Sequence, residues 1–249
     1  MRRVLEADLK RIMAKILPWL LILIVYIVLG VSLAIQIDTK PDRTFFFLQR
    51  TTECYSFVGL IIGFSVLLGV YGDEFKSMVM IGVIGRGISR DKFVLAKFFD
   101  TLILAFIITA LTAIYVGILQ LVFGVTLNAA EMKYLICTYV FDYIELTCCI
   151  TIASIFYFLS ENSAIGMFAF LAFETIIPVT IELLVMLSNL QRYHINRYYI
   201  VGLSASAYSD FILGDIVGAL AKIFVCIAVY MVGALFITVL VFRKKELEF

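Results

Sequence analysis

Long apolar runs alternate with short polar segments over the whole chain. The runs cover residues of about 17–37, 52–71, 98–124, 133–159, 164–188 and 211–242. A helix needs about 20 mostly apolar residues to cross the roughly 30 Å hydrocarbon layer of a bilayer, and all six runs reach that length. The pattern therefore predicts an all-α membrane protein with six transmembrane helices, in which residues 1–249 form a single transmembrane domain.

Residues 1–17 predict a separate amphipathic helix in the membrane interface. Their apolar residues recur at the spacing of one helical face, and their basic residues occupy the other faces. Such a helix lies in the membrane plane with its basic side chains toward anionic headgroups, so membrane lipid is an expected partner. Pro18 and Trp19 are expected to mark the corner into the first span. The alternative is a continuous first helix that protrudes from the membrane.

The distribution of basic residues predicts the orientation in the membrane. An even number of spans places both ends of the chain on one side. The N-terminal arm, the 72–97 segment and the C-terminal tail carry thirteen Lys and Arg residues, whereas the opposite loops carry six. Because cytoplasmic loops are enriched in Lys and Arg, we expect a multi-pass protein of the cell membrane with both termini in the cytoplasm.

Composition narrows the classes of function. Of the 249 residues, 63% are hydrophobic and 16% charged, and the mean hydropathy is +1.06, which excludes a soluble globular domain. The net charge of +1 gives no overall field for nucleic acid, which is not an expected partner. The five cysteines form no C-x-x-C pair and His194 is the only histidine, so no metal site is predicted.

The segment 72–97, which follows the second predicted span, begins with the pattern of a short amphipathic helix. Asp73 is suited to cap the helix, and Glu74 falls in its first turn. One helical face would carry the apolar residues Phe75, Met78 and Val79. The segment therefore predicts a helix that offers an apolar face to a partner on the cytoplasmic side.

The residues that follow this helix resemble a known family. They are Gly87, Ser89, Arg90 and Lys97. With the preceding acidic residue and amphipathic helix, they resemble the coupling-helix region of type-2 ABC transporter permeases. Subunits of that family have an amphipathic N-terminal helix, six spans, cytoplasmic termini and an outer loop that dips back into the membrane before span six. Each feature has a counterpart here; the alternative is an ordinary charged loop.

The resemblance implies that the chain is not itself an enzyme but a permease subunit powered by a separate ABC ATPase subunit. The sequence has no G-x-x-x-x-G-K-[ST] motif, so ATP and Mg²⁺ are expected on the ATPase, with no cofactor in this chain. Residues 73–84 would dock in a groove of the ATPase. The coupling residues implied are Asp73, Glu74, Phe75, Met78, Val79 and Arg90. A second permease subunit is also implied, with a homodimer favoured.

Ionisable side chains inside the predicted spans mark a candidate substrate path. They are Asp142, Glu145, Glu174, Glu182 and Lys222. At 1.5 Å per residue from the cytoplasmic side, Glu174 lies about 15 Å deep, Glu145 about 22 Å, Asp142 and Glu182 about 27 Å, and Lys222 about 30 Å. Charges in spans are costly and usually face a cavity or a partner. One interpretation is an acidic stripe for a cationic cargo; the other is pairing of Lys222 with Glu182 or Asp142 that only stabilises the bundle.

Two further features of the later spans carry predictions. Pro178 is expected to kink the fifth span beside Glu174, because it removes a backbone hydrogen bond. Residues 189–210 contain four tyrosines around an apolar core, too apolar for a free loop and too short to span twice. We expect this stretch to form a re-entrant segment in the outer interface.

The sequence thus favours a permease that exports amphipathic or cationic peptides. Export of drugs or lipids by the same kind of machine is one alternative. A proton-coupled secondary transporter with Glu174 as its relay is another. A metalloprotease of the H-E-x-x-H type is excluded, since the chain has a single histidine.

Overall fold

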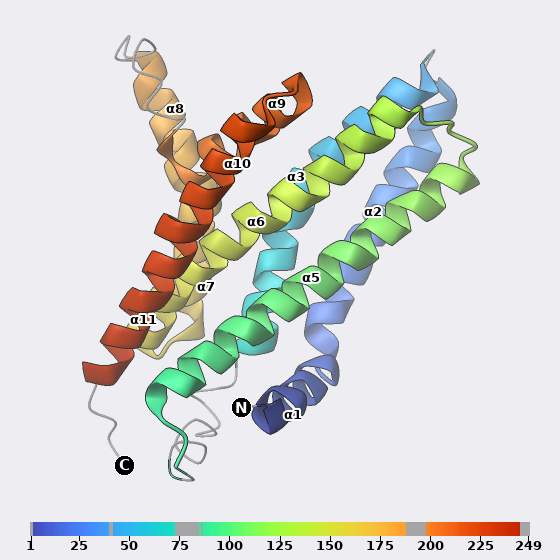
Figure 1. Ribbon diagram of the computed structural model, residues 1–249. Coiled ribbons are helices and arrows are strands. Elements are labelled where there is room, and N and C mark those ends of the chain that lie inside the picture. The colour runs from blue at the N-terminus through green and yellow to red at the C-terminus, as the bar shows by residue number, and fades with distance from the viewer. Residues whose placement is uncertain (1, 40–41, 73–84, 86, 188–197, 245–249) are drawn as a thin grey trace.

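The computed structural model describes residues 2–39, 42–72, 85, 87–187 and 198–244, and in these ranges every regular element is a helix (Figure 1). The α-helices are α1 (Arg2–Met13), α2 (Ile16–Gln36), α3 (Arg43–Val70), α5 (Arg90–Val122), α6 (Ala129–Ser160), α7 (Ser163–Leu171), α8 (Ile177–Leu187), α9 (Ile200–Leu213), α10 (Ile216–Val225) and α11 (Gly233–Lys244). The other elements are the 3-10 helix η1 (Ile37–Thr39) and the π-helices η2 (Ala172–Ile176) and η5 (Cys226–Val232).

Five helical stretches among the described residues are long and apolar enough to cross a membrane. They are Ile16–Gln36, Arg90–Val122, Ala129–Ser160, Ser163–Leu187 and Ile216–Lys244. The predicted second span, 52–71, lies within α3, whose described apolar part is the shorter stretch Val58–Val70. The structure therefore confirms a multi-span, all-helical protein.

The start predicted for the last span is wrong by five residues. Residues 211–213 still belong to α9, and Gly214 then ends that helix in the left-handed conformation, at φ 95°. Glycine adopts this conformation without steric cost. Asp215 caps the next helix by accepting a hydrogen bond of 2.9 Å from the Gly218 amide, so the last membrane-crossing stretch begins at Ile216.

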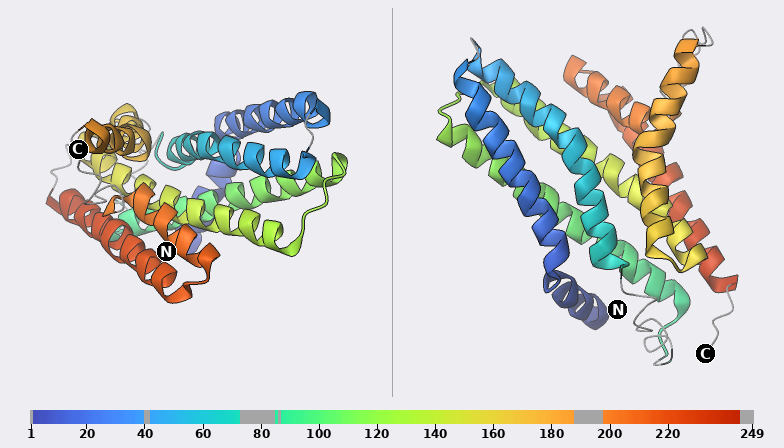
Figure 2. Two further views of the ribbon diagram at one scale, coloured as in Figure 1. Left: turned by 90° about the horizontal axis from the view of Figure 1, so that it is seen from above. Right: turned by 180° about the vertical axis from the view of Figure 1, so that it is seen from behind.

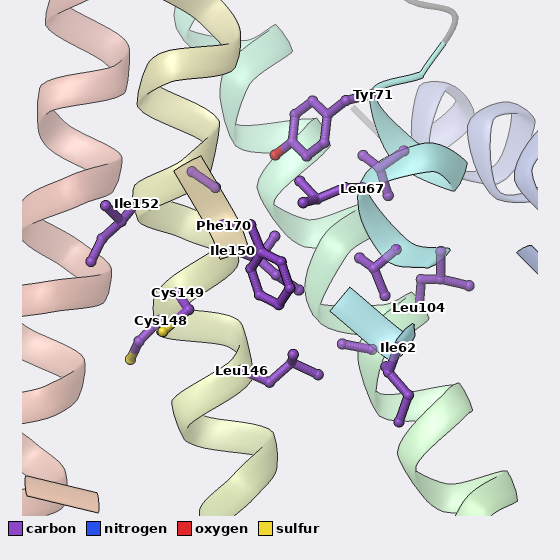
Figure 3. Packing of buried hydrophobic residues seen from close by; sticks show 14 of the residues in the cluster. Ile62, Leu67, Tyr71, Leu104, Leu146, Cys148, Cys149, Ile150, Ile152 and Phe170 are labelled. Atoms are coloured by element: carbon purple, nitrogen blue, oxygen red, sulfur yellow. The ribbon is translucent and has the colours of Figure 1, made fainter. Parts of the chain in front are cut away.

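The central helix is α6, which packs against α3, α5, α7, α9, η5 and α11. Of its most apolar window 61% is buried, against 6% for the Ser163–Leu187 stretch, so α6 carries the core and α7–α8 lie at the periphery. Figure 3 shows this core, with Leu146 and Ile150 of α6 beside Phe170 of α7. A side chain at Gly63 of α3 would collide with the Phe170 ring, so glycine permits this close packing.

The first two helices are separate, which rules out the continuous first helix. Lys15 is extended, at φ −75° and ψ 123°, and its ammonium donates a hydrogen bond of 2.9 Å to the Gly69 carbonyl near the end of α3. The indole N–H of Trp19 donates to the Met13 carbonyl at 3.2 Å. The corner thus lies at Ala14 and Lys15 rather than at the expected Pro18, which lies buried inside α2.

The two ends of the bundle differ in what they present. Figures 1 and 2 show α1 and the last turn of α11 at one end, and α8 with the α9–α10 pair at the other.

The predicted docking helix 73–84, with Asp73, Glu74, Phe75, Met78 and Val79, lies outside the described residues. Of the predicted coupling residues, Arg90 is described. Part of the predicted segment 189–210 is described, and from Ile200 onward it forms α9.

Candidate functional site within the helical bundle

Three of the predicted path residues come together where η2 lies against α6. Asp142 and Glu145 lie one turn apart on α6, and Glu174 lies on η2. Their carboxylates are close enough for their like charges to interact. We call Asp142, Glu145 and Glu174 the acidic cluster. Among the described residues, no Lys or Arg forms an ion pair with any of them.

The polar neighbours of the acidic cluster are neutral side chains. The Cys149 thiol of α6 faces Glu174, and the Ser204 hydroxyl of α9 faces Glu145. The oxygen Oε2 of Glu174 is buried and has no hydrogen-bond partner in the part of the chain that the structure describes. In that same part, no three His, Cys, Asp or Glu side chains are arranged to hold a metal ion. The cluster therefore has acceptor capacity that the described protein groups leave unused.

The π-helix η2, rather than a simple kink, accommodates Pro178. The Ile177 amide donates to the Ala172 carbonyl, five residues back. In the same register, the amide of residue 178 would donate to the Phe173 carbonyl. Residue 178 is proline, which has no N–H. The Tyr199 hydroxyl donates to that carbonyl instead, at 2.5 Å. This bond ties the start of α9 to the fifth span directly beside Glu174.

A second π-helix, η5, interrupts the last membrane-crossing stretch and also packs against α6. The Cys148 thiol donates to the Cys226 carbonyl at 3.7 Å, and the Tyr230 hydroxyl donates to the Tyr198 carbonyl at 2.8 Å. A backbone carbonyl of each π-helix therefore accepts a side-chain hydrogen bond from a neighbouring element, Phe173 of η2 from Tyr199 and Cys226 of η5 from Cys148. Single-turn π-bulges in α-helices are frequent at functional sites.

The other two predicted path residues, Glu182 and Lys222, lie apart from the acidic cluster. Both line a pocket of about 440 Å³ between α8, α9 and α10, together with Asp210. The expected pairing of Lys222 with Glu182 or Asp142 is wrong, because Lys222 pairs with Asp210, at 2.5 Å. The turn at Gly214 reverses the chain, so α9 and α10 pack together and Asp210 meets Lys222 across the turn.

At the α1 end, the start of α5 is bound to the end of α11. The Arg90 guanidinium donates to the carbonyls of Phe242, at 3.1 Å, and Arg243, at 3.2 Å. In return, Arg243 donates from Nε to Asp91 at 2.6 Å, and from a second nitrogen to the other carboxylate oxygen. We call these four residues the end clamp. Ser89 caps α5 by accepting from the Lys92 amide at 3.4 Å.

A buried ion pair joins α1 to α5. Lys97 is fully buried, and its ammonium lies 2.8 Å from the Asp8 carboxylate and 3.9 Å from that of Asp100. Sequence reasoning missed Asp8 as the partner of Lys97. Each residue can be located from the sequence, Asp8 as an acid on the predicted amphipathic helix and Lys97 at the approach to the third span. No sequence pattern indicates that the two would meet.

Asp210 was also missed as a site residue, and its signal is clearer. Gly214 followed by Asp215 is the pattern of a helix stop and a new N-cap. It predicts two helices packed across a tight turn and brings the residues on either side together.

No protein-family model matches this sequence, and no curated protein is significantly similar to it.

Proposed function

We propose that this chain is the membrane-spanning permease subunit of an ATP-driven ABC exporter that moves amphipathic or cationic peptides out of the cell. A separate ATPase subunit would dock on residues 73–84 and bind ATP and Mg²⁺. A second permease subunit, most simply another copy, would complete the pathway. In this proposal α3 supplies the sixth span, α1 lies in the membrane interface and both termini are cytoplasmic.

The acidic cluster carries the proposal. Ionised groups in membrane-spanning segments are costly and are typical of substrate and ion pathways. A cluster with a structural role alone would be paired with a cation, but no described cation pairs with these carboxylates. A carboxylate of the cluster that ionises has no described cation to neutralise it, which favours a cationic cargo over an anionic one.

The end clamp supports the coupling to an ATPase. Helix α5 follows directly on the segment proposed to dock, and the clamp binds its first residues to the end of α11. Helix α11 in turn packs against α6, which carries Asp142 and Glu145. A push on the docking segment would therefore move α5 and α11 as one body and reach the acidic cluster through packed helices.

A proton-coupled carrier is the second candidate, and one observation favours it. The buried oxygen Oε2 of Glu174, which has no hydrogen-bond partner among the described residues, is suited to take up and release a proton. Export of drugs or lipids uses the same machine and differs only in cargo.

Transport in inside-out vesicles separates these functions. The complex is reconstituted with the ATPase that copurifies with it, and uptake of a fluorescent cationic peptide is followed. We expect uptake to require ATP and to persist when an ionophore collapses the proton gradient. Uptake that follows the proton gradient and ignores ATP would overturn the ABC assignment in favour of the carrier.

A further inference from the structure

The pocket between α8, α9 and α10 combines apolar side chains with hydroxyl and ionisable groups. Its lining comprises Pro178, Ile181, Glu182, Tyr199, Val201, Gly202, Ala205, Ser206, Ser209, Asp210, Leu213 and Lys222. We call it the outer pocket. Its volume of about 440 Å³ falls in the range of sites that hold small molecules or one substituent of a larger ligand.

The ionisable groups of the outer pocket leave it with one excess negative charge. Lys222 neutralises Asp210 through the 2.5 Å pair. Glu182 is exposed on the otherwise apolar helix α8, and no Lys or Arg among the described residues pairs with it. An unpaired carboxylate in an apolar, membrane-crossing stretch needs a cation or a proton.

The hydroxyl groups of the lining have already used their protons. Ser206 donates to the Leu203 carbonyl and Ser209 to the Ala205 carbonyl, both at 2.9 Å. Tyr199 donates to the Phe173 carbonyl. A hydroxyl that donates keeps acceptor capacity on its oxygen. The pocket therefore offers hydroxyl and carboxylate acceptors, and a complementary ligand must bring donors and positive charge.

We propose that the outer pocket binds a primary ammonium or guanidinium group carried on a small apolar body. Glu182 is the counter-ion, and Asp210 accepts from the opposite side while Lys222 holds it in place. Pro178, Ile181 and Leu213 contact the apolar body. Gly218 is part of this arrangement, since a side chain there would collide with Asp215 and crowd the Asp210 carboxylate.

The pocket differs from the acidic cluster in location and in lining, although Tyr199 borders both. The identification of the bound group as part of the cargo rests on the proposed function. The binding of an ammonium or guanidinium group in the pocket does not depend on it. The same ammonium chemistry occurs on a peptide and on an aminophospholipid headgroup, so the test includes both sources.

The test measures binding to the purified full chain in nanodiscs, without ATP. The probe is a short dansylated apolar peptide with one lysine, compared with the same peptide acetylated on that lysine. Nanodiscs of phosphatidylcholine alone are compared with nanodiscs that also contain phosphatidylethanolamine. We expect acetylation and Glu182→Gln each to weaken binding about tenfold or more, since a hydrogen bond to a charged group contributes about 1.5–3 kcal/mol. The control Glu161→Gln, between α6 and α7, should leave binding unchanged.

A second variant has the opposite expected sign. Lys222→Met takes the excess charge of the pocket from one negative to two, so binding of the lysine probe should tighten. If the residues were only structural, both variants would weaken binding together. Weaker probe binding in the phosphatidylethanolamine nanodiscs would identify a lipid headgroup as the ligand, and equal binding would identify the peptide amine.

Equal affinity for the lysine and acetylated probes, or for wild type and Glu182→Gln, overturns the proposal. Either result would leave ATP-driven transport untouched. Conversely, failure of ATP-driven transport would leave charge-dependent binding in the pocket intact.

Discussion

Replacing Tyr199 with phenylalanine removes one oxygen and tests how the fifth span is held beside Glu174. The hydroxyl of Tyr199 supplies the Phe173 carbonyl, which the π-helix and Pro178 leave without a backbone donor. The phenylalanine ring fits the same space, so the variant isolates the hydrogen bond. We expect lower stability and a less ordered junction between η2 and α9.

The magnitude follows from the cost of an unpaired carbonyl. Loss of one partner typically costs about 1–3 kcal/mol, whereas interhelical hydrogen bonds measured in membrane proteins average about 0.6 kcal/mol. The Tyr199 bond is short, at 2.5 Å, and the register of η2 followed by Pro178 leaves its acceptor without a backbone donor from this stretch of helix. We therefore expect a loss of about 1–2 kcal/mol in the free energy of unfolding.

The assay is unfolding of the purified chain by SDS titration in mixed micelles. Tyr198→Phe is the matched control, because the Tyr198 side chain is 74% exposed. Pro178→Ala supplies a background in which residue 178 has an N–H that can serve the freed carbonyl. In that background, Tyr199→Phe should cost less than it does alone. Equal costs in both backgrounds would refute the link between Pro178 and Tyr199.

Three further predictions address the α1 end and the ATPase. Lys97→Met should lower the free energy of unfolding by about 3–5 kcal/mol, because it leaves the Asp8 carboxylate without its buried partner. Lys92→Met, at an exposed lysine of the same helix, should cost far less. Similar losses for the two variants in the same unfolding titration would contradict a buried Lys97–Asp8 ion pair. Phe75→Asp or Met78→Asp should abolish copurification of the ATPase, since each puts a charge into a proposed apolar interface, and full copurification would argue for a solvated loop. The purified chain alone should hydrolyse no ATP, and turnover that scales with this chain would overturn its role as a permease subunit.

Much of the fold follows from the sequence, because an apolar run long enough to cross the membrane predicts a helix of about that length. The apolar runs 17–37 and 133–159 lie within four residues of the bounds of α2 and α6, whereas α5 begins at Arg90, eight residues before the run 98–124. The amphipathic pattern of residues 1–17 predicted a helix separate from α2. The predicted helix ends differ most from the observed ones where a capping residue determines the end. Asp42 starts α3 well before the apolar run, and Gly214 ends α9 inside a run that reads as one span.

The candidate site was predictable in its residues but not in its groupings. Glu174 was assigned a depth about 7 Å from that of Glu145, counted with an α-helical rise, yet the two carboxylates interact. Glu174 lies on the π-helix η2, and a π-helix leaves no periodic signature in sequence from which its register could be counted. Lys222 was given the wrong partner because depth counting matched it to residues on other spans. Its actual partner, Asp210, comes from the neighbouring helix.

The measurement that tests the central claim most directly is the dependence of transport on cargo charge at the acidic cluster. ATP-dependent uptake into inside-out vesicles is measured for a cationic peptide and for its acetylated, neutral analogue. Wild type and the control Glu161→Gln should transport the cationic peptide in preference to the neutral one. Glu174→Gln, which keeps the shape of the side chain but removes its charge, should lose that preference while the complex still assembles and hydrolyses ATP. An unchanged preference in Glu174→Gln would contradict the claim that the acidic cluster attracts a cationic cargo.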